Sequence, residues 1–244
     1  MRTARAVLAA VSGALLLAGC SASPAPDRTL TVFAAASLRE AFDEIGAAFT
    51  DAHPEVTVSA RYDGSSTLVT QLTEGADADV LATADEPSMA AAGAAQLVED
   101  PRVFATNTLV VAVPRGNPGG VRTLADLPRV LTVLCAPQVP CGAAATRLLR
   151  AAAVTVVPAS LEQNVSAVLT KVATGEADAG LVYATDVRGE DDVDSFVPAG
   201  AVEVVNRYPI AATRSAGPAG RAFVDFVTGR TGQQILAEHG FGAP

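Results

Sequence analysis

The sequence predicts an α/β fold with two lobes, and three observations support this prediction. From Thr29 onward, short apolar runs typical of strands alternate with segments whose apolar residues recur at helical spacing. Residues 114–120, rich in proline and glycine, interrupt this alternation, which then starts again. The end of the chain is closer in pattern to the first block than to the middle. We therefore expect the chain to leave the first lobe near residues 111–114 and to return near 205–210.

The same patterns give the order of the elements. Strands are predicted at 29–34, 56–60, 79–82, 107–113, 131–134 and 179–183, with an extended segment at 202–213. Helices are predicted at 38–49, 66–74, 87–94, 143–152, 165–174, 219–228 and 232–238. Lobe I is then expected to comprise residues 29–112 plus 207–244, and lobe II residues 113–206.

The N-terminus has the pattern of an export signal. Arg2 and Arg5 precede an apolar run that is too short to span a membrane, and the run ends in Leu-Ala-Gly before Cys20. This ending resembles the lipoprotein box of bacteria, in which the cysteine carries the lipid. We expect residues 1–19 to be a signal peptide and residues 20–28 a lipid-anchored tether. The protein is then exported and held on the extracytoplasmic face of the cell membrane.

The charge of the chain restricts its partners. Removal of residues 1–19 takes away two arginines and no acidic residue, so the formal net charge goes from −9 to −11. Nucleic acid is excluded as a partner because its phosphates require basic surfaces. An anionic ligand would have to be held by local dipoles, since the overall field repels it.

Two cysteines remain besides Cys20. Cys135 and Cys141 enclose a short loop that contains two prolines. In an exported protein this pair most simply forms a disulfide, and two free buried thiols are the alternative. A zinc site is disfavoured because two cysteines without neighbouring histidines supply only half of the ligands.

Two serines mark predicted junctions between a strand and a helix. Ser37 ends the run Val-Phe-Ala-Ala-Ala-Ser, and Ser65 follows Asp-Gly, in each case where a helical pattern begins. A helix start exposes unpaired N–H groups at the positive end of the helix dipole. The two serines could be simple helix caps, but two such junctions in one fold favour an anion site.

Five segments, taken in order, resemble the periplasmic molybdate-binding proteins of ABC importers. They are VFAAASL at 32–38, GSSTL at 64–68, GADADV at 75–80, GLVY at 180–183 and HGF at 239–241. The resemblance runs from about residue 29 to residue 241. It implies a class II periplasmic-binding-protein fold, whose two lobes close on a tetrahedral oxyanion and present it to a membrane permease. It also implies a monomer that works without a cofactor, a resident metal or a catalytic residue.

The resemblance also implies a set of ligand residues. The family's hydroxyl ligands fall on Ser37 and Ser65, and its tyrosine falls on Tyr183. Two backbone amides fall on Cys141, after a Val-Pro pair, and on Val165 at a helix start. Cys141 departs from the small apolar residue that is more usual in the family, and a bridge to Cys135 would make its loop stiffer. The expected ligand is molybdate, with tungstate nearly indistinguishable in size and charge.

Other functions remain open at this point. The nearest is a receptor for another tetrahedral oxyanion such as sulfate. An exported serine hydrolase using Ser37 or Ser65 needs a general base, yet the chain has only His53 and His239 and no Gly-x-Ser-x-Gly motif. The sensing domain of a transcription regulator is disfavoured by the export signal.

Overall fold

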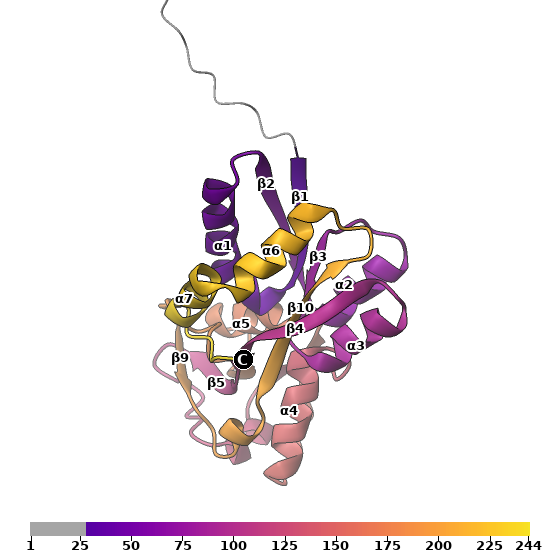
Figure 1. Cartoon of the computed structure of the whole chain (residues 1–244). Helices are drawn as coiled ribbons and strands as arrows, with labels where there is room; N and C mark the ends of the chain where they lie inside the picture. Colours follow the sequence, from indigo (N-terminus) through magenta and orange to yellow (C-terminus); the bar gives the residue numbers. More distant parts are fainter. Residues whose placement is uncertain (1–27) are drawn as a thin grey trace, which may run out of the picture.

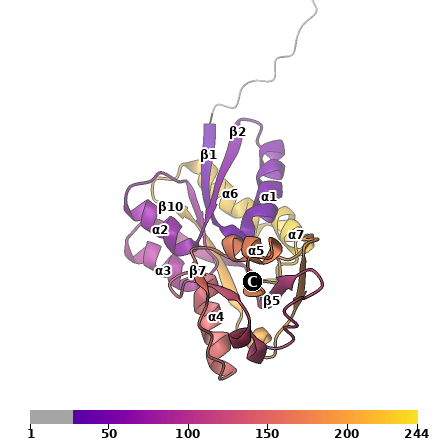
Figure 2. The same ribbon diagram turned by 180° about the vertical axis from the view of Figure 1, so that it is seen from behind.

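The computed structural model describes residues 28–244 and contains two five-stranded sheets, each covered by helices (Figure 1, Figure 2). The predicted signal peptide, Cys20 and the predicted tether up to residue 27 lie outside the described residues. The strand order is β2-β1-β3-β10-β4 in the first sheet and β7-β6-β8-β5-β9 in the second. Two lobes of α/β structure, as predicted, follow from this arrangement.

The first sheet contains the parallel strands β1 (Arg28–Ala35), β2 (Val56–Asp63) and β3 (Val80–Ala82). Strand β10 (Asn206–Thr213) runs antiparallel to β3 and to β4 (Val98–Asn107). Around it lie the turn η1 (Ala36–Leu38) and the helices α1 (Arg39–Ala52), α2 (Ser65–Thr73), α3 (Glu86–Ala94), α6 (Pro218–Thr228) and α7 (Arg230–Glu238).

The second sheet contains β6 (Thr132–Cys135), parallel to β7 (Ser160–Glu162) and to β8 (Ala179–Tyr183). Strand β5 (Leu109–Pro114) runs antiparallel to β8 and to β9 (Val193–Phe196). The remaining elements of this half are the helices α4 (Pro140–Ala151) and α5 (Val165–Ala173) and the 3-10 turns η2 (Leu124–Arg129) and η3 (Ala201–Glu203).

Both faces of the first sheet are buried under helices. Along β1, Val32 belongs to the core shared with α1, α6 and α7, and the next residue, Phe33, belongs to the core under α2 and α3. This alternation follows from the pleat of a strand, which turns successive side chains to opposite faces. Phe42, Phe49 and Phe223 join α1 to α6 by edge-to-face contacts, with ring centroids 6.2 and 5.2 Å apart.

All the predicted helices are present, and the strand predicted at 107–113 is found as β5 at 109–114. Its start differs from the prediction, because Asn107 ends β4 and the chain changes sheets at Thr108, between β4 and β5. The lobe boundary expected at residue 112 therefore falls inside β5. Asn206, expected in lobe II, is the first residue of β10 in the first sheet. A continuous β-rich run does not reveal where its backbone leaves one sheet for another.

From the sheets, lobe I is defined here as residues 28–107 plus 206–244, and lobe II as residues 109–203. The sequence missed β4, β7 and β9, which are edge strands with exposed, polar residues. Edge strands lack the continuous apolar signal of buried ones. Among residues 28–244, no helix combines the length and the apolar character needed to cross a membrane.

Candidate functional site

A small pocket lies between the two lobes, at the carboxyl ends of the parallel strands. Its cavity volume is small, about 10 Å³. Lobe I contributes residues 35–37, 63–65 and 84, and lobe II contributes residues 139–141, 164, 165 and 183. All five residues that the resemblance singles out line this one pocket: Ser37, Ser65, Cys141, Val165 and Tyr183. Loops at the carboxyl ends of strands, where the two halves face each other, are the usual place for ligands in α/β proteins.

Four helix N-termini meet at this pocket. The turn η1 and the helices α2 and α4 begin there without a side-chain cap in the described part of the chain. Helix α5 begins there too, and its cap residue Asn164 accepts only the N–H of Ala167, at 3.0 Å. First-turn N–H groups have no partner within their own helix. The pocket therefore collects the positive ends of several backbone dipoles.

The hydroxyl of Ser65 is fixed from within lobe I. The side chain is buried, at 1% exposure, and its Oγ accepts the N–H of Ala84 at 2.9 Å. Because the oxygen is the acceptor in this bond, the O–H of Ser65 stays available as a donor. Ser37 is half-buried, and its Oγ lies 3.0 Å from the hydroxyl of Tyr208. Both serines are thus held by neighbours rather than free to rotate.

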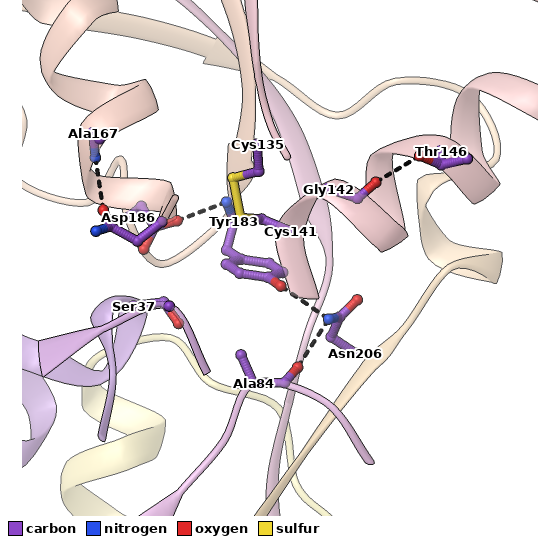
Figure 3. Close-up of a disulfide and its surroundings, with 12 residues drawn as sticks. Ser37, Ala84, Cys135, Cys141, Gly142, Thr146, Ala167, Tyr183, Asp186 and Asn206 are labelled. Atoms are coloured by element: carbon purple, nitrogen blue, oxygen red, sulfur yellow. Dashed lines mark hydrogen bonds between the residues drawn. A yellow bond between two sulfur atoms is a disulfide. The ribbon is translucent and has the colours of Figure 1, made fainter. Parts of the chain in front are cut away.

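Tyr183 presents its hydroxyl from lobe II (Figure 3). This hydroxyl accepts from Nδ2 of Asn206 at 2.9 Å, and the same Nδ2 donates to the carbonyl of Ala84 at 2.9 Å. Burial raises the pKa of Tyr183, and also that of Tyr208, well above the ordinary value. Both phenols therefore keep their protons at neutral pH and can donate them to hydrogen bonds.

A disulfide adjoins the pocket through Cys141, and Figure 3 shows it next to Tyr183. It joins Cys135, at the end of β6, to Cys141 in the first turn of α4, with the Cα atoms 5.7 Å apart, so the predicted bridge is present. A Cβ atom added at Gly142 would overlap the carbonyl oxygen of Ala136. The first turn of α4 is therefore packed backbone to backbone against the loop that the bridge closes.

Sequence reasoning missed three residues around Tyr183. Asn206 and Tyr208 lie on β10, where an extended segment gave no sign that two buried side chains hydrogen-bond to the pocket residues Tyr183 and Ser37. Asp186 follows β8, and its Oδ2 accepts the N–H of Tyr183 at 2.7 Å. Burial of this carboxyl raises its pKa to about 7. An acidic side chain can reach back to the N–H three residues before it, as in a capping box, and this spacing between Tyr183 and Asp186 could have indicated the bond.

Among the described residues, the one charged side chain that lines the pocket is acidic, that of Asp63, whereas the basic side chains of Arg39 and Lys171 are engaged elsewhere. No lysine or arginine is among the described residues that line it. The guanidinium of Arg39 stacks on the ring of Tyr62, 4.4 Å from its centroid, and Lys171 pairs with Glu162 at 2.6 Å. Within residues 28–244, no group of three His, Cys, Asp or Glu side chains is placed to hold a metal ion. The donors of the pocket are hydroxyls and backbone amides.

The family model described as "Bacterial extracellular solute-binding protein" matches residues 30–242. This chain belongs to that family. A similar curated relative is the molybdate-binding protein ModA of Mycobacterium tuberculosis strain H37Rv, 45% identical over 223 residues, which are 89% of this chain and 85% of the relative. The resemblance inferred from the five segments is thereby confirmed.

Solved structures share the fold of this solute-binding protein. The periplasmic molybdate-binding protein of Azotobacter vinelandii superposes with a TM-score of 0.75 at 18% identity, covering 88% of this chain and 99% of that one. The sulfate-binding protein SubI of M. tuberculosis superposes with a TM-score of 0.71 at 18% identity, covering 88% and 86%. The predicted two-lobed periplasmic-binding fold is confirmed. At such identities the likeness carries the fold alone.

Proposed function

We propose that this chain captures molybdate outside the cytoplasm, binds tungstate as well, and delivers the oxyanion to the permease of an ABC importer. The observation that carries the proposal is the convergence of four helix N-termini and two serine hydroxyls on one pocket between the lobes, where none of the lining residues in the 28–244 range is basic. We name molybdate as the ion because this chain is 45% identical to a molybdate-binding protein.

The physics of a buried dianion supports this ligand class. An oxyanion loses a large hydration energy on burial, so it needs several donors that replace water at once. Each helix N-terminus carries roughly half a positive charge, and four of them can offset a double charge without a formal cation. Fixed amides also favour one ion size, because they cannot follow a smaller sulfate inward as a flexible lysine could.

We assign the donors as follows. Lobe I supplies the hydroxyls of Ser37 and Ser65, and lobe II supplies the amides of Cys141 and Val165. Tyr183 donates through its hydroxyl, since its backbone N–H is already bound to Asp186 at 2.7 Å. Asn206, on the other side of that hydroxyl, keeps the oxygen in place by donating to it.

The proposed role is binding rather than catalysis. The hydroxyl partners of the two serines are Tyr208 and the backbone of Ala84, whereas a nucleophilic serine needs a general base such as histidine. His239 lies 2.8 Å from Glu44. We further propose that the protein is a monomer, lipid-anchored at Cys20 on the outer face of the cell membrane.

Calorimetric titration of the purified protein with molybdate, tungstate and sulfate tests the proposal. We expect tight binding of molybdate and tungstate and weaker binding of sulfate at the same pH and ionic strength. Sulfate, another tetrahedral oxyanion, is the second candidate. Sulfate binding that is tighter than molybdate binding would assign the site to sulfate, and absence of heat with all three anions would reject an oxyanion receptor.

A further inference from the structure

The two lobes contact each other in the wall of the pocket, at the junctions that begin α2 and α5. Oδ1 of Asp63, in lobe I, accepts Nδ2 of Asn164, in lobe II, at 3.0 Å. The same Oδ1 accepts the N–H of Gly64 at 2.7 Å. This hydrogen bond joins the residue before the α2 cap to the cap of α5, so it ties together the two helix starts that carry Ser65 and Val165.

Gly64 makes the closest backbone contact of this junction. A Cβ atom added there would overlap the carbonyl oxygen of Gln163, and the third-nearest atom, in Val139, also belongs to lobe II. Yet Gly64 has φ −60° and ψ 136°, a conformation open to any residue. Lobe I by itself therefore does not require glycine at this position. The missing side chain matters only when lobe II approaches.

Asn164 combines two tasks that can be separated. Its Oδ1 caps α5 by accepting the N–H of Ala167 at 3.0 Å, and aspartate would cap equally well. Its Nδ2, which aspartate lacks, donates to Asp63. The amide is thus required by the contact between the lobes and not by the helix.

Resting on the proposed function, we propose that Asp63, Gly64 and Asn164 form a closure latch that sets anion affinity without binding the anion. The latch stabilises only the closed arrangement, because its hydrogen bond and its backbone contact both cross the lobes. Since the observed affinity is the intrinsic affinity scaled by the fraction of closed, competent protein, loss of the latch weakens binding with all donors still in place. These are positioning residues.

Two single variants break the latch in different ways. Gly64→Ala adds a methyl group that meets Gln163, and Asn164→Asp keeps the cap but places a carboxylate against Asp63. We expect each to weaken molybdate binding by about tenfold or more, with the circular dichroism spectrum of the anion-free protein unchanged. Gly93→Ala is the matched control: it adds the same methyl group in lobe I, on an exposed turn of α3 with no atom within 4 Å.

A reciprocal exchange separates the latch from a merely structural role. In Asp63→Asn/Asn164→Asp the amide lies in lobe I and the carboxylate in lobe II, so the hydrogen bond forms again, Gly64 keeps its acceptor and α5 keeps its cap. We expect this double variant to recover most of the affinity lost in Asn164→Asp. Affinity of Gly64→Ala equal to that of the Gly93→Ala control, or a double variant no better than Asn164→Asp, would overturn the latch.

Small-angle scattering distinguishes this proposal from the function on which it rests. With saturating molybdate, the wild type should contract more than Gly64→Ala or Asn164→Asp. If the wild type binds none of the three oxyanions, the proposed function fails, and the latch is judged on the anion-free proteins. There it requires both variants to have a larger radius of gyration than the wild type, and equal radii would reject it.

Discussion

The two lobes offer the pocket different kinds of donor. In the ligand set that we propose, lobe I presents the side-chain hydroxyls of Ser37 and Ser65, and lobe II presents two backbone amides together with one phenol. The hydroxyls are held by single hydrogen bonds, from Ala84 to Ser65 and between Tyr208 and Ser37. The amides are held by the covalent bridge below α4 and by the Asn164 cap of α5.

This difference teaches how each half responds to substitution. In lobe I a change of side chain removes the donor itself. In lobe II most side chains can change while the N–H stays, provided that the helix start keeps its position. The anion affinity of the pocket should therefore depend on side-chain identity in lobe I and on backbone position in lobe II. The predictions below test that contrast.

The largest expected effect is on the pH dependence of stability. It concerns Asp186, which holds Tyr183, the one proposed side-chain donor of lobe II. Tyr183 is held by Asp186, whose pKa is raised to about 7 by burial, opposed by the Tyr183 N–H and reinforced by Glu40. A carboxyl with a raised pKa keeps its proton longer in the folded state, so stability falls as pH rises from about 4 to about 7. Above pH 7 the full cost is at most about 4 kcal/mol.

Asp186→Asn should therefore match the wild type in stability near pH 4 and exceed it above pH 7, because the amide still accepts the N–H of Tyr183. Denaturant unfolding at several pH values measures this. Asp126→Asn is the control of opposite sign: hydrogen bonds from Arg122 and Thr123 lower the pKa of Asp126, so its contribution is present at neutral pH and lost as pH falls. Parallel pH profiles for wild type and Asp186→Asn would contradict the prediction.

The next largest effect is a loss of anion affinity when one proposed donor is removed. We begin with the two serines of lobe I. Ser37→Ala and Ser65→Ala each delete a hydroxyl facing a buried charge, which costs roughly 1.5 to 3 kcal/mol, or about tenfold to a hundredfold in affinity. Ser65→Ala should also lower the free energy of unfolding, because the N–H of Ala84 loses its acceptor.

The matching change in lobe II is Val165→Pro. Val165 is the first residue of α5 and follows an extended Asn164, a position where proline is well tolerated. Proline has no N–H, so affinity should fall as far as in the serine variants while the helix persists. Calorimetry with molybdate and circular dichroism check the two parts. Unchanged affinity in any of the three variants would remove that residue from the ligand set.

The disulfide gives a smaller effect. Closing so short a loop is expected to contribute about 2 kcal/mol to stability. Cys135→Ser/Cys141→Ser should unfold at lower denaturant concentration and bind molybdate more weakly, since the N–H of Cys141 sits on a looser turn. In the wild type both thiols should react with a labelling reagent only after reduction. Immediate labelling of the untreated protein would contradict the bridge.

The contrast between the lobes also explains what the sequence could reveal. The helices, the serine junctions and the strand of Tyr183 carry side-chain signals, and the structure brings both junctions and Tyr183 to one pocket. Cys141 and Val165 were reachable only through resemblance, because an amide donor leaves no trace in the residue type. Asn206, Tyr208 and the change of sheet at Thr108 depend on contacts between distant segments, which local patterns do not encode.

Val165→Ala is the smallest expected effect and the sharpest test of the amide assignment. Val165 is buried, so its truncation should lower the free energy of unfolding by about 1.5 kcal/mol through lost apolar contact. The N–H remains, and the Asn164 cap still fixes the first turn of α5. Affinity for molybdate should therefore stay close to that of the wild type, while Val165→Pro loses it. If Val165→Ala weakens binding as much as Val165→Pro does, the side chain of Val165 contributes to anion affinity by shaping the pocket. The assignment of its backbone amide as a donor would then be wrong.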